Sequence, residues 1–184
     1  KDLHPTADMP TTYGSPDFAN HQPTEDAGIV NRIKAAGGIP IGKTNIPERS
    51  IGANTVNPLF GATGNPFGPT LTCGGSSGGS GVALATNMAP LATGSDHGGS
   101  VRIPACYSGV VGHRATPGVV PHELRSMAQT FYSVQGPMAR TVEDTALLLS
   151  VIADRDTGNR PHDPMMFPLD AESFSQLETI DPRT

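Results

Sequence analysis

The chain contains the segments CGGSSGGSG at residues 73–81 and GSDHGGSVRIPA at residues 94–105, each beside a short apolar run. Glycine–serine runs are usually loops, but consecutive glycines let neighbouring backbone N–H groups turn toward one point. Converging N–H groups of this kind form an oxyanion hole, which stabilises the charge of a tetrahedral intermediate. The two segments together therefore predict a catalytic site.

The second segment brings donors, a hydroxyl and two opposite charges within a few residues of one another. We expect four backbone N–H groups to surround the serine hydroxyl of this turn, those of His97, Gly98, Gly99 and Ser100. Asp96 and Arg102 flank the turn, where a charge-assisted hydrogen bond between them would brace it. The alternative, that both are solvated charges on a loop, stays open at this point.

Apolar periodicity around these segments predicts the fold class. Helices are expected at residues 25–36, 80–88 and 142–153. Strands are expected in the IPIG run at residues 39–42 and at residues 89–94 and 110–114. Thr24 would cap the first helix and Gly37 would end it, while Thr141 and Asp144 form a capping-box-like pair at the last. Because a helix–glycine–strand order is typical of parallel units, we predict a mixed, largely parallel α/β sheet flanked by helices.

Composition excludes several classes of protein. The 184 residues carry a formal net charge of −5, with 36% hydrophobic and 16% charged residues. Such a chain can form a core, and it lacks the basic run of a nucleic-acid-binding protein and the roughly 18–20 apolar residues of a membrane span. Cys73 and Cys106 are too few and too far apart for a disulfide framework or a zinc site. We therefore expect a cytoplasmic protein, with Cys106 as a small buried residue.

Residues 37–44, GGIPIGKT, match the P-loop pattern of nucleotide-binding proteins. That mechanism needs backbone amides between a strand and a following helix. Here a predicted helix precedes the pattern, and Pro40 removes one of the required amides. We interpret the run as a buried strand that ends in a turn.

Residues 74–78, GGSSG, match the nucleophile elbow of α/β-hydrolases, for which His97, His113 or His122 would supply a base. An elbow needs a strand that leads directly into the motif, and residues 61–73 do not form a strand of useful length in our prediction. An α/β-hydrolase-type esterase is therefore kept only as an alternative.

Longer stretches of the chain resemble the amidase signature family, serine hydrolases with a Ser–Ser–Lys triad. The similar stretches, in family order, are IGKTNIPE (41–48), NPFGPTLTCGGSSGGSGVALA (65–85), LATGSDHGGSVRIPACYSGVVGHRATPG (91–118) and QGPMARTVEDTALLL (135–149). The opening KDL, followed by PTTYGSP, is similar to the lysine segment of that family. We therefore expect a catalytic core at residues 1–154, incomplete at both ends, and a polar, proline-rich exit segment at residues 155–184.

The resemblance implies a role for each member of the triad. Ser100 matches the nucleophile that forms the acyl-enzyme, Ser76 matches the bridging serine, and Lys1 matches the lysine base. Ser77 is implied as a supporting residue, whereas Lys43 lies in a neighbouring family segment. The residues alone single out Ser100 and Ser76, because a lysine at the start of a chain is by default a solvated charge.

The resemblance also implies the reaction, hydrolysis of the C–N bond of a small-molecule amide without a metal or an organic cofactor. It leaves a second function open, that of the glutaminase subunit of a tRNA-dependent amidotransferase, and a third in which the chain is a catalytically silent fragment. A homo-oligomer stays open as well. His97 stands where the family more often has threonine or an aliphatic residue, so its side chain either contacts substrate or lends only its backbone N–H.

Overall fold

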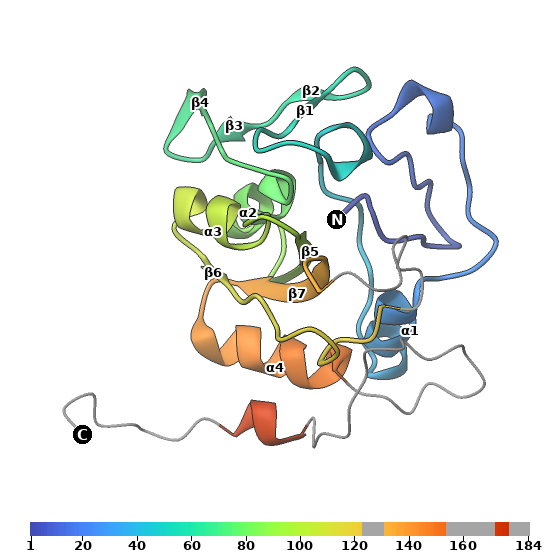
Figure 1. Ribbon diagram of the computed structural model, residues 1–184, viewed down its shortest axis with the longest axis vertical. Helices are drawn as coiled ribbons and strands as arrows, with labels where there is room; N and C mark the ends of the chain where they lie inside the picture. Colours follow the sequence, from blue (N-terminus) through green and yellow to red (C-terminus); the bar gives the residue numbers. More distant parts are fainter. Residues whose placement is uncertain (123–130, 154–171, 177–184) are drawn as a thin grey trace.

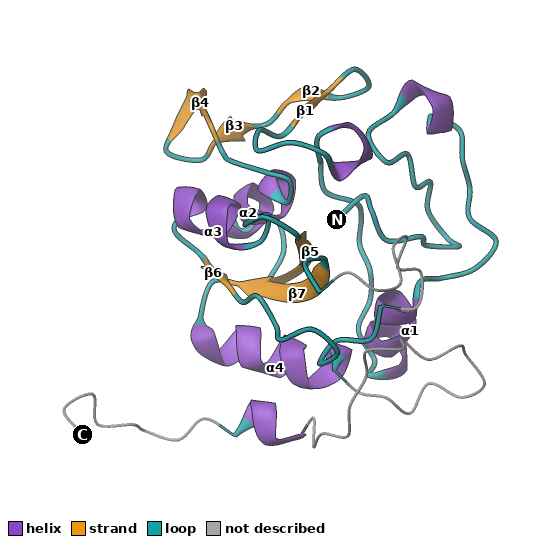
Figure 2. Cartoon of the chain, in the orientation of Figure 1, coloured by secondary structure: helices purple, strands orange, loops and turns teal. Residues whose placement is uncertain are grey.

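The computed structural model describes residues 1–122, 131–153 and 172–176, and Figures 1 and 2 show how their elements are arranged. The boundary that we expected at residue 154, and nearly all of the expected exit segment, lie outside these residues. Within them, no helix combines the length and the apolar character needed to cross a membrane.

The described part of the chain contains α-helices, short strands and 3-10 helices. The α-helices are α1 (Gly28–Ala35), α2 (Gly78–Ala85), α3 (Arg102–Ser108) and α4 (Val142–Ile152). The strands are β1 (Val56–Asn57), β2 (Gly61–Ala62), β3 (Gly64–Asn65), β4 (Gly68–Thr72), β5 (Leu91–Asp96), β6 (Val111–Gly112) and β7 (Val134–Ala139). Short 3-10 helices are η1 (Pro16–Phe18), η2 (Glu48–Ser50) and η3 (Glu172–Ser175).

A three-stranded sheet in the order β5–β7–β6 lies at the centre of the molecule. Strand β7 is buried along its whole length and pairs with β5 from Leu91 opposite Ala139 to Asp96 opposite Val134. Helix α4 packs on one face of this sheet, and α2 and α3 lie on the other, as Figure 1 shows. The helix–sheet–helix layering agrees with the expected α/β class.

The direction of strand pairing differs from our prediction. Every strand pair among the described residues is antiparallel, whereas we expected a largely parallel sheet. The parallel prediction rested on the IPIG run, which is not a strand: the side chains of Ile39 and Ile41 are 83% and 73% exposed. The sequence of a short apolar run does not determine its secondary structure, because a strand also needs a neighbouring strand to pair with. In the described part of the chain, no strand lies beside this run.

The other predicted elements are largely confirmed. Strands β5 and β6 and helices α2 and α4 fall within or close to the expected ranges, and the Thr141 hydroxyl accepts the N–H of Asp144 at 3.0 Å. Helix α1 begins later than predicted, with Ala27 rather than Thr24 as its N-cap. We did not predict α3, in which Pro104 is tolerated because N–H groups of the first turn have no helical partner. Nor did we predict β7, which contains both glycine and proline.

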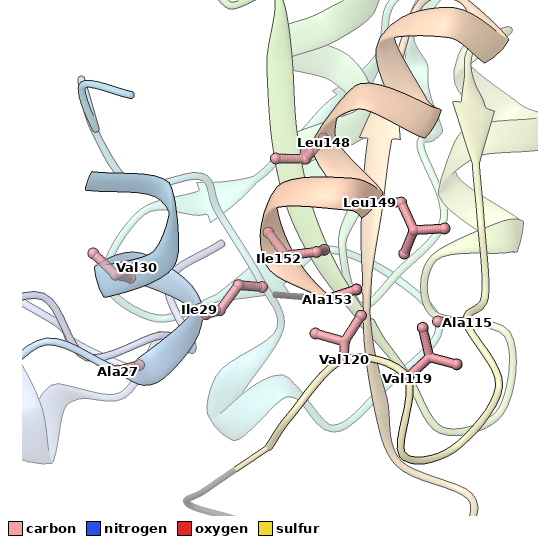
Figure 3. Close-up of a cluster of buried hydrophobic side chains, with 10 residues drawn as sticks. All are labelled: Ala27, Ile29, Val30, Ala115, Val119, Val120, Leu148, Leu149, Ile152 and Ala153. Atoms are coloured by element: carbon pink, nitrogen blue, oxygen red, sulfur yellow. The ribbon is translucent and has the colours of Figure 1, made fainter. Parts of the chain in front are cut away.

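Two clusters of apolar side chains hold the layers together. The larger one, shown in Figure 3, joins α1 to α4 and to the segment that follows β6. Its buried members are Ala27, Ile29, Val30, Ala115, Val119, Val120, Leu148, Leu149, Ile152 and Ala153. The smaller cluster lies on the other face of the sheet and consists of Leu84, Val101, Ala105 and Met138. The smaller cluster joins α2 and α3 to the central strand β7, and Ser95 of β5 and the residues just before α2 belong to the site described below.

Candidate active site

Lys1 is buried inside the molecule, with only 6% of its surface exposed. Its Nζ lies 2.8 Å from the Oγ of Ser76 and 2.7 Å from the Oγ of Ser95, and it donates a hydrogen bond to each. Figure 1 shows the N-terminus in the interior of the ribbon, near α2 and β5. The default interpretation of this lysine as a solvated charge is therefore wrong.

Burial changes the acid–base properties of Lys1. Removal from water disfavours the ammonium form and lowers the pKa of its side chain to about 7, although the nearby Asp96 carboxylate acts in the opposite direction. A large fraction of Lys1 is therefore neutral near pH 7 and carries a lone pair that can accept a proton. This is the property that a lysine base needs.

Ser76 is held between Lys1 and a second hydroxyl. It is 2% exposed, follows a cis peptide bond between Gly75 and Ser76, and lies just before α2. Its Oγ accepts hydrogen bonds from Lys1 Nζ and from Ser50 Oγ, both at 2.8 Å. Close packing accounts for the glycines at the start of α2, because a side chain on Gly79 would run into the backbone of Asn45.

Ser100 ends the turn between β5 and α3 and is half-buried. Its carbonyl oxygen accepts the N–H of Ser77 at 3.1 Å, so the two glycine–serine segments are joined directly through their backbones. Both segments open onto one cavity of about 750 Å³. Its wall includes Ser50, Ser76, Ser95, Ser100, His97 and Gly98.

Ser77 supports this junction from within the core. It is fully buried, and its Oγ contacts the backbone of Ser95, accepting the N–H at 3.3 Å and lying 3.4 Å from the carbonyl oxygen. This contact ties the start of α2 to β5. Ser77 therefore helps to position the neighbouring site residues by holding the backbone of Ser95.

Asp96 is a fully buried carboxylate whose oxygens are both used by donors. It accepts the N–H groups of Gly99 at 2.8 Å and Val101 at 3.2 Å, and the guanidinium of Arg102 twice at 3.0 Å. Burial raises the pKa of this carboxyl, but the hydrogen bonds and the charge of Arg102 together lower it to about 2. The two residues brace the turn, as expected, and are not a pair of unrelated surface charges.

The predicted oxyanion donors have different surroundings. The N–H of Gly99, which has a φ of 111°, is already bonded to Asp96, whereas His97, Gly98 and Ser100 line the cavity. The side chain of His97 is exposed and lies beside the ring of Tyr132, with 5.6 Å between their centroids. Which of these groups contacts a substrate stays a prediction.

Three site residues were absent from the sequence prediction: Ser95, Ser50 and Arg114. Ser95 directly precedes Asp96 in β5, and successive side chains of a strand point to opposite faces. A strand through both residues therefore places Ser95 on the face opposite to Asp96, a signal that the prediction overlooked. Arg114 donates to the carbonyl oxygen of Asp96 at 2.6 Å and to that of Tyr132 at 2.9 Å. Ser50 lies in a loop with no pattern that would single it out.

The other sequence motifs do not form sites. Lys43, the lysine of the P-loop pattern, donates to the carbonyl oxygen of His4 and to Thr11 Oγ1 at 2.9 Å, and no helix follows it in the manner of a P-loop. Cys73 is buried and lies 3.2 Å from the carbonyl oxygen of Thr63, whereas Cys106 is exposed, so our prediction of a buried Cys106 is wrong. In the described ranges, no three His, Cys, Asp or Glu side chains gather in a way that could hold a metal ion.

The chain is similar to known proteins over most of its length. The Amidase family model matches residues 1–182. An acylamidase from Rhodococcus erythropolis is 44% identical over 161 residues, which are 86% of this chain and 33% of that protein. A glutamyl-tRNA(Gln) amidotransferase subunit from Halobacterium salinarum is 47% identical over 157 residues, or 85% of this chain and 37% of that protein. The chain thus spans about a third of the length of these relatives.

Solved structures give the same result for the fold. 6-Aminohexanoate cyclic dimer hydrolase complexed with substrate matches with a TM-score of 0.85 at 34% identity, over 96% of this chain and 37% of the other. Native peptide amidase from Stenotrophomonas maltophilia matches with a TM-score of 0.78 at 37% identity, over 90% of this chain and 34% of the other. These neighbours confirm the expected fold class.

Proposed function

This chain belongs to the Amidase family, and from that premise we propose that its site hydrolyses a carboxylic amide through an acyl-enzyme on Ser100. The observation that carries the proposal is the 2.8 Å contact between buried Lys1 and Ser76, in a cavity that Ser100 also lines. A serine hydroxyl becomes a strong nucleophile only when a base removes its proton. A buried lysine with a pKa of about 7 is such a base.

In the proposed first half of the reaction, neutral Lys1 accepts the proton of Ser76 while Ser76 accepts the proton of Ser100. The Oγ of Ser100 then attacks the amide carbonyl carbon, and the carbonyl oxygen becomes negatively charged. Backbone N–H groups of the turn at residues 97–100 stabilise that charge, and loss of one such donor typically costs about 2.7–4 kcal/mol.

In the second half, the C–N bond breaks and the leaving amine receives the proton from Lys1 through Ser76. Water then attacks the acyl carbon and gives one proton to the same relay. The bond between the acyl carbon and Ser100 Oγ breaks, the relay returns that proton to Ser100 Oγ, and the carboxylic acid leaves. The atoms balance as one amide and one water converted to one acid and one amine. The side chains of Lys1, Ser76 and Ser100 carry out every proton transfer in this scheme.

The arrangement of charges around Lys1 supports this proposal. Asp96 is the carboxylate that acts to raise the pKa of Lys1, and its oxygens are already occupied by Arg102 and backbone donors. Its influence on Lys1 is therefore weakened, since the guanidinium compensates much of the negative charge. A base that is neutral at physiological pH can persist under these conditions.

Covalent labelling tests the proposal. In the naturally occurring protein, a fluorophosphonate probe should add its mass to Ser100, and Ser100→Ala should abolish this addition. Ser76→Ala and Lys1→Ala should slow labelling by about 100-fold or more, as expected for loss of general-base catalysis. The matched control is Ser150→Ala, which removes a hydroxyl bonded to the carbonyl oxygen of Leu147 on α4. Labelling that survives Ser100→Ala would overturn the assignment of the nucleophile, and absence of labelling in the unaltered protein would favour a silent fragment.

Similarity to the amidotransferase protein favours a second candidate, a glutaminase that passes ammonia to a partner. The two functions share the proposed acyl-enzyme and differ in substrate range. Hydrolysis of simple amides by the protein alone would support the amidase. Turnover restricted to glutamine and dependent on an added partner protein would support the second function.

A further inference from the structure

The loop that contains η2 brings a third hydroxyl into contact with the proposed proton relay. The Oγ of Ser50 lies 2.8 Å from the Oγ of Ser76 and donates to it, although the two residues are 26 positions apart. Neither glycine–serine segment contains Ser50. The contact therefore exists only because the loop folds over the start of α2.

The backbone of the loop at Arg49 and Ser50 adopts a conformation that residues other than glycine rarely adopt. Arg49 has a φ of 52° and Ser50 has a φ of 62°, so two consecutive residues lie in the left-handed region. Each such residue raises the energy of the fold and persists only when the surrounding structure enforces it. Conformations of this kind concentrate at functional sites.

Contacts on both sides enforce the loop. The N–H of Arg49 donates to the carbonyl oxygen of Tyr13 at 2.6 Å, and the N–H of Ser50 donates to that of Pro47 at 2.8 Å. Side chains of the same loop are held as well.

The guanidinium of Arg49 pairs with Asp17 at 2.8 Å. The carboxylate of Glu48 accepts a hydrogen bond from the hydroxyl of Ser15 at 2.7 Å. The segment thus holds one hydroxyl in place against the bridging serine.

We propose that Ser50 is a positioning residue that donates its O–H to Ser76 Oγ and stabilises the negative charge developing there as the proton passes from Ser100 to Lys1. This inference rests on the proposed function of the triad. Ser50 keeps its own proton throughout, so the balance of the reaction is unchanged. Charge-assisted hydrogen bonds of this type are about twice as strong as neutral ones.

The geometry of the Ser76 hydroxyl makes the contact directional. A hydroxyl oxygen has one O–H and two lone pairs, and hence three hydrogen-bonding directions. Lys1 occupies one direction and Ser50 a second. One direction remains for the hydroxyl of Ser100, which lines the same cavity. The hydrogen bond from Ser50 therefore keeps the Ser76 hydroxyl from forming hydrogen bonds with other partners.

The donor also acts on the protonation of Lys1. A hydrogen bond from Ser50 makes Ser76 Oγ a weaker acceptor for the ammonium of Lys1 and a better donor to its neutral amine, so it favours the neutral form. Among the described residues, Asp96 raises the pKa of Lys1, and Asp2, His4 and Lys43 are further charged or titratable groups close to it. Removal of the Ser50 hydroxyl leaves these groups in place and should raise the pKa of Lys1.

Two substitutions distinguish the effect of the Ser50 hydroxyl from the effect of the backbone conformation. Ser50→Ala removes the hydroxyl and keeps a side chain at the unfavourable φ. Ser50→Gly also removes the hydroxyl, but glycine adopts this φ without strain. In the naturally occurring protein, both should lower kcat for an amide by about tenfold, less than loss of a direct oxyanion donor, with KM unchanged. Both should also move the acidic limb of the pH–rate profile to higher pH. Ser150→Ala is the control for loss of a serine hydroxyl.

A titration of Lys1 by NMR of the 15N-labelled side-chain amine gives a measurement that needs no turnover. If the unaltered protein hydrolyses no amide, the proposed function fails, while a rise of the Lys1 pKa in Ser50→Ala still supports the contact with Ser76. An unchanged Lys1 pKa in both variants would overturn the inference. Full kcat in Ser50→Gly with reduced kcat in Ser50→Ala would also overturn it, because the backbone would then be responsible.

Discussion

Two buried ionisable groups lie at the end of β5, Lys1 in contact with the strand and Asp96 within it, and they differ in protonation. Lys1, which contacts Ser95, is surrounded by hydroxyls, and its pKa falls to about 7. Asp96 is the next residue along the strand, is surrounded by N–H donors, and has a pKa of about 2. Successive strand residues point to opposite faces, so one strand end serves both environments. Burial therefore neutralises a charged side chain unless hydrogen-bonding partners or a group of opposite charge stabilise the charged form.

Replacement of the lysine should produce the largest effect. Lys1→Met removes the base and keeps an unbranched side chain of similar length, so acylation of Ser100 should fall by about 10²–10⁴-fold. Stability should be maintained or improved, because a buried amine gives way to an apolar group. Labelling kinetics and urea unfolding of the same samples measure the two effects. A variant that retains more than about a tenth of the unaltered rate would show that Lys1 is not the base.

Replacement of the carboxylate should instead cost stability. Asp96→Asn removes the charge that pairs with Arg102 and replaces one acceptor oxygen by a donor, which leaves N–H groups of the turn unsatisfied. The free energy of unfolding should fall by about 3 kcal/mol, because Asp96 itself is fully buried and the N–H donors around it stay buried without their acceptor. Urea denaturation measures it. A loss below about 1 kcal/mol would contradict the bracing role and indicate that solvent satisfies the turn.

Both groups have a lowered pKa in the folded protein, so both make stability rise with pH, but in two separate pH ranges. The pKa of Lys1 is about 7 in the folded protein and 10.5 as its ordinary value, so between these the unfolded chain binds the extra proton and stability rises with pH. For Asp96, with a pKa of about 2 against 3.8, the stabilisation is present above about pH 4 and is lost as pH falls toward 2.

The contribution of Lys1 to this dependence is measured as a difference between proteins. The slope between about pH 7 and 9 should be steeper in the unaltered protein than in Lys1→Met, by at most about 1.4 kcal/mol per pH unit. The comparison of two variants removes the contribution of Lys43, whose pKa is also lowered, to about 8. Equal slopes would mean that Lys1 titrates as an exposed side chain.

The smallest effect is expected from a substitution of Arg114, which contacts Asp96. Arg114 bridges the carbonyl oxygen of Asp96 to those of Tyr132 and Phe131, and a lysine lacks the fork of donors for three such contacts. Arg114→Lys should therefore lower the free energy of unfolding by about 1 kcal/mol and leave the Lys1 pKa unchanged. Unfolding measurements and the Lys1 titration check both statements. Arg114 also pairs with Asp96 Oδ1 at 3.2 Å, so a shift of the Lys1 pKa would show that a lysine at position 114 does not replace this ion pair.

Elements with strong local signals were predictable from the sequence. The capped helix α4 and the apolar strand β5 are where they were expected, because caps and apolar periodicity operate within a few residues. Helix α3 and strand β7 were missed because each contains proline, which local rules count as a breaker. The IPIG run was wrongly predicted as a strand because its apolar residues are exposed in the folded protein.

The sequence by itself determined the candidate serines, the turn between Asp96 and Arg102, and the family resemblance that pointed to Lys1. The serines and the turn each depend on residues within one short segment, where spacing alone dictates geometry, and the resemblance depends on several such segments in a fixed order. Only the tertiary structure decided that Lys1 is buried, that it contacts Ser76 and Ser95 at separations of 75 and 94 residues, and that Ser50 contacts Ser76 as well. These contacts depend on how the layers pack, and the pKa of a side chain follows from that packing rather than from its neighbours in sequence.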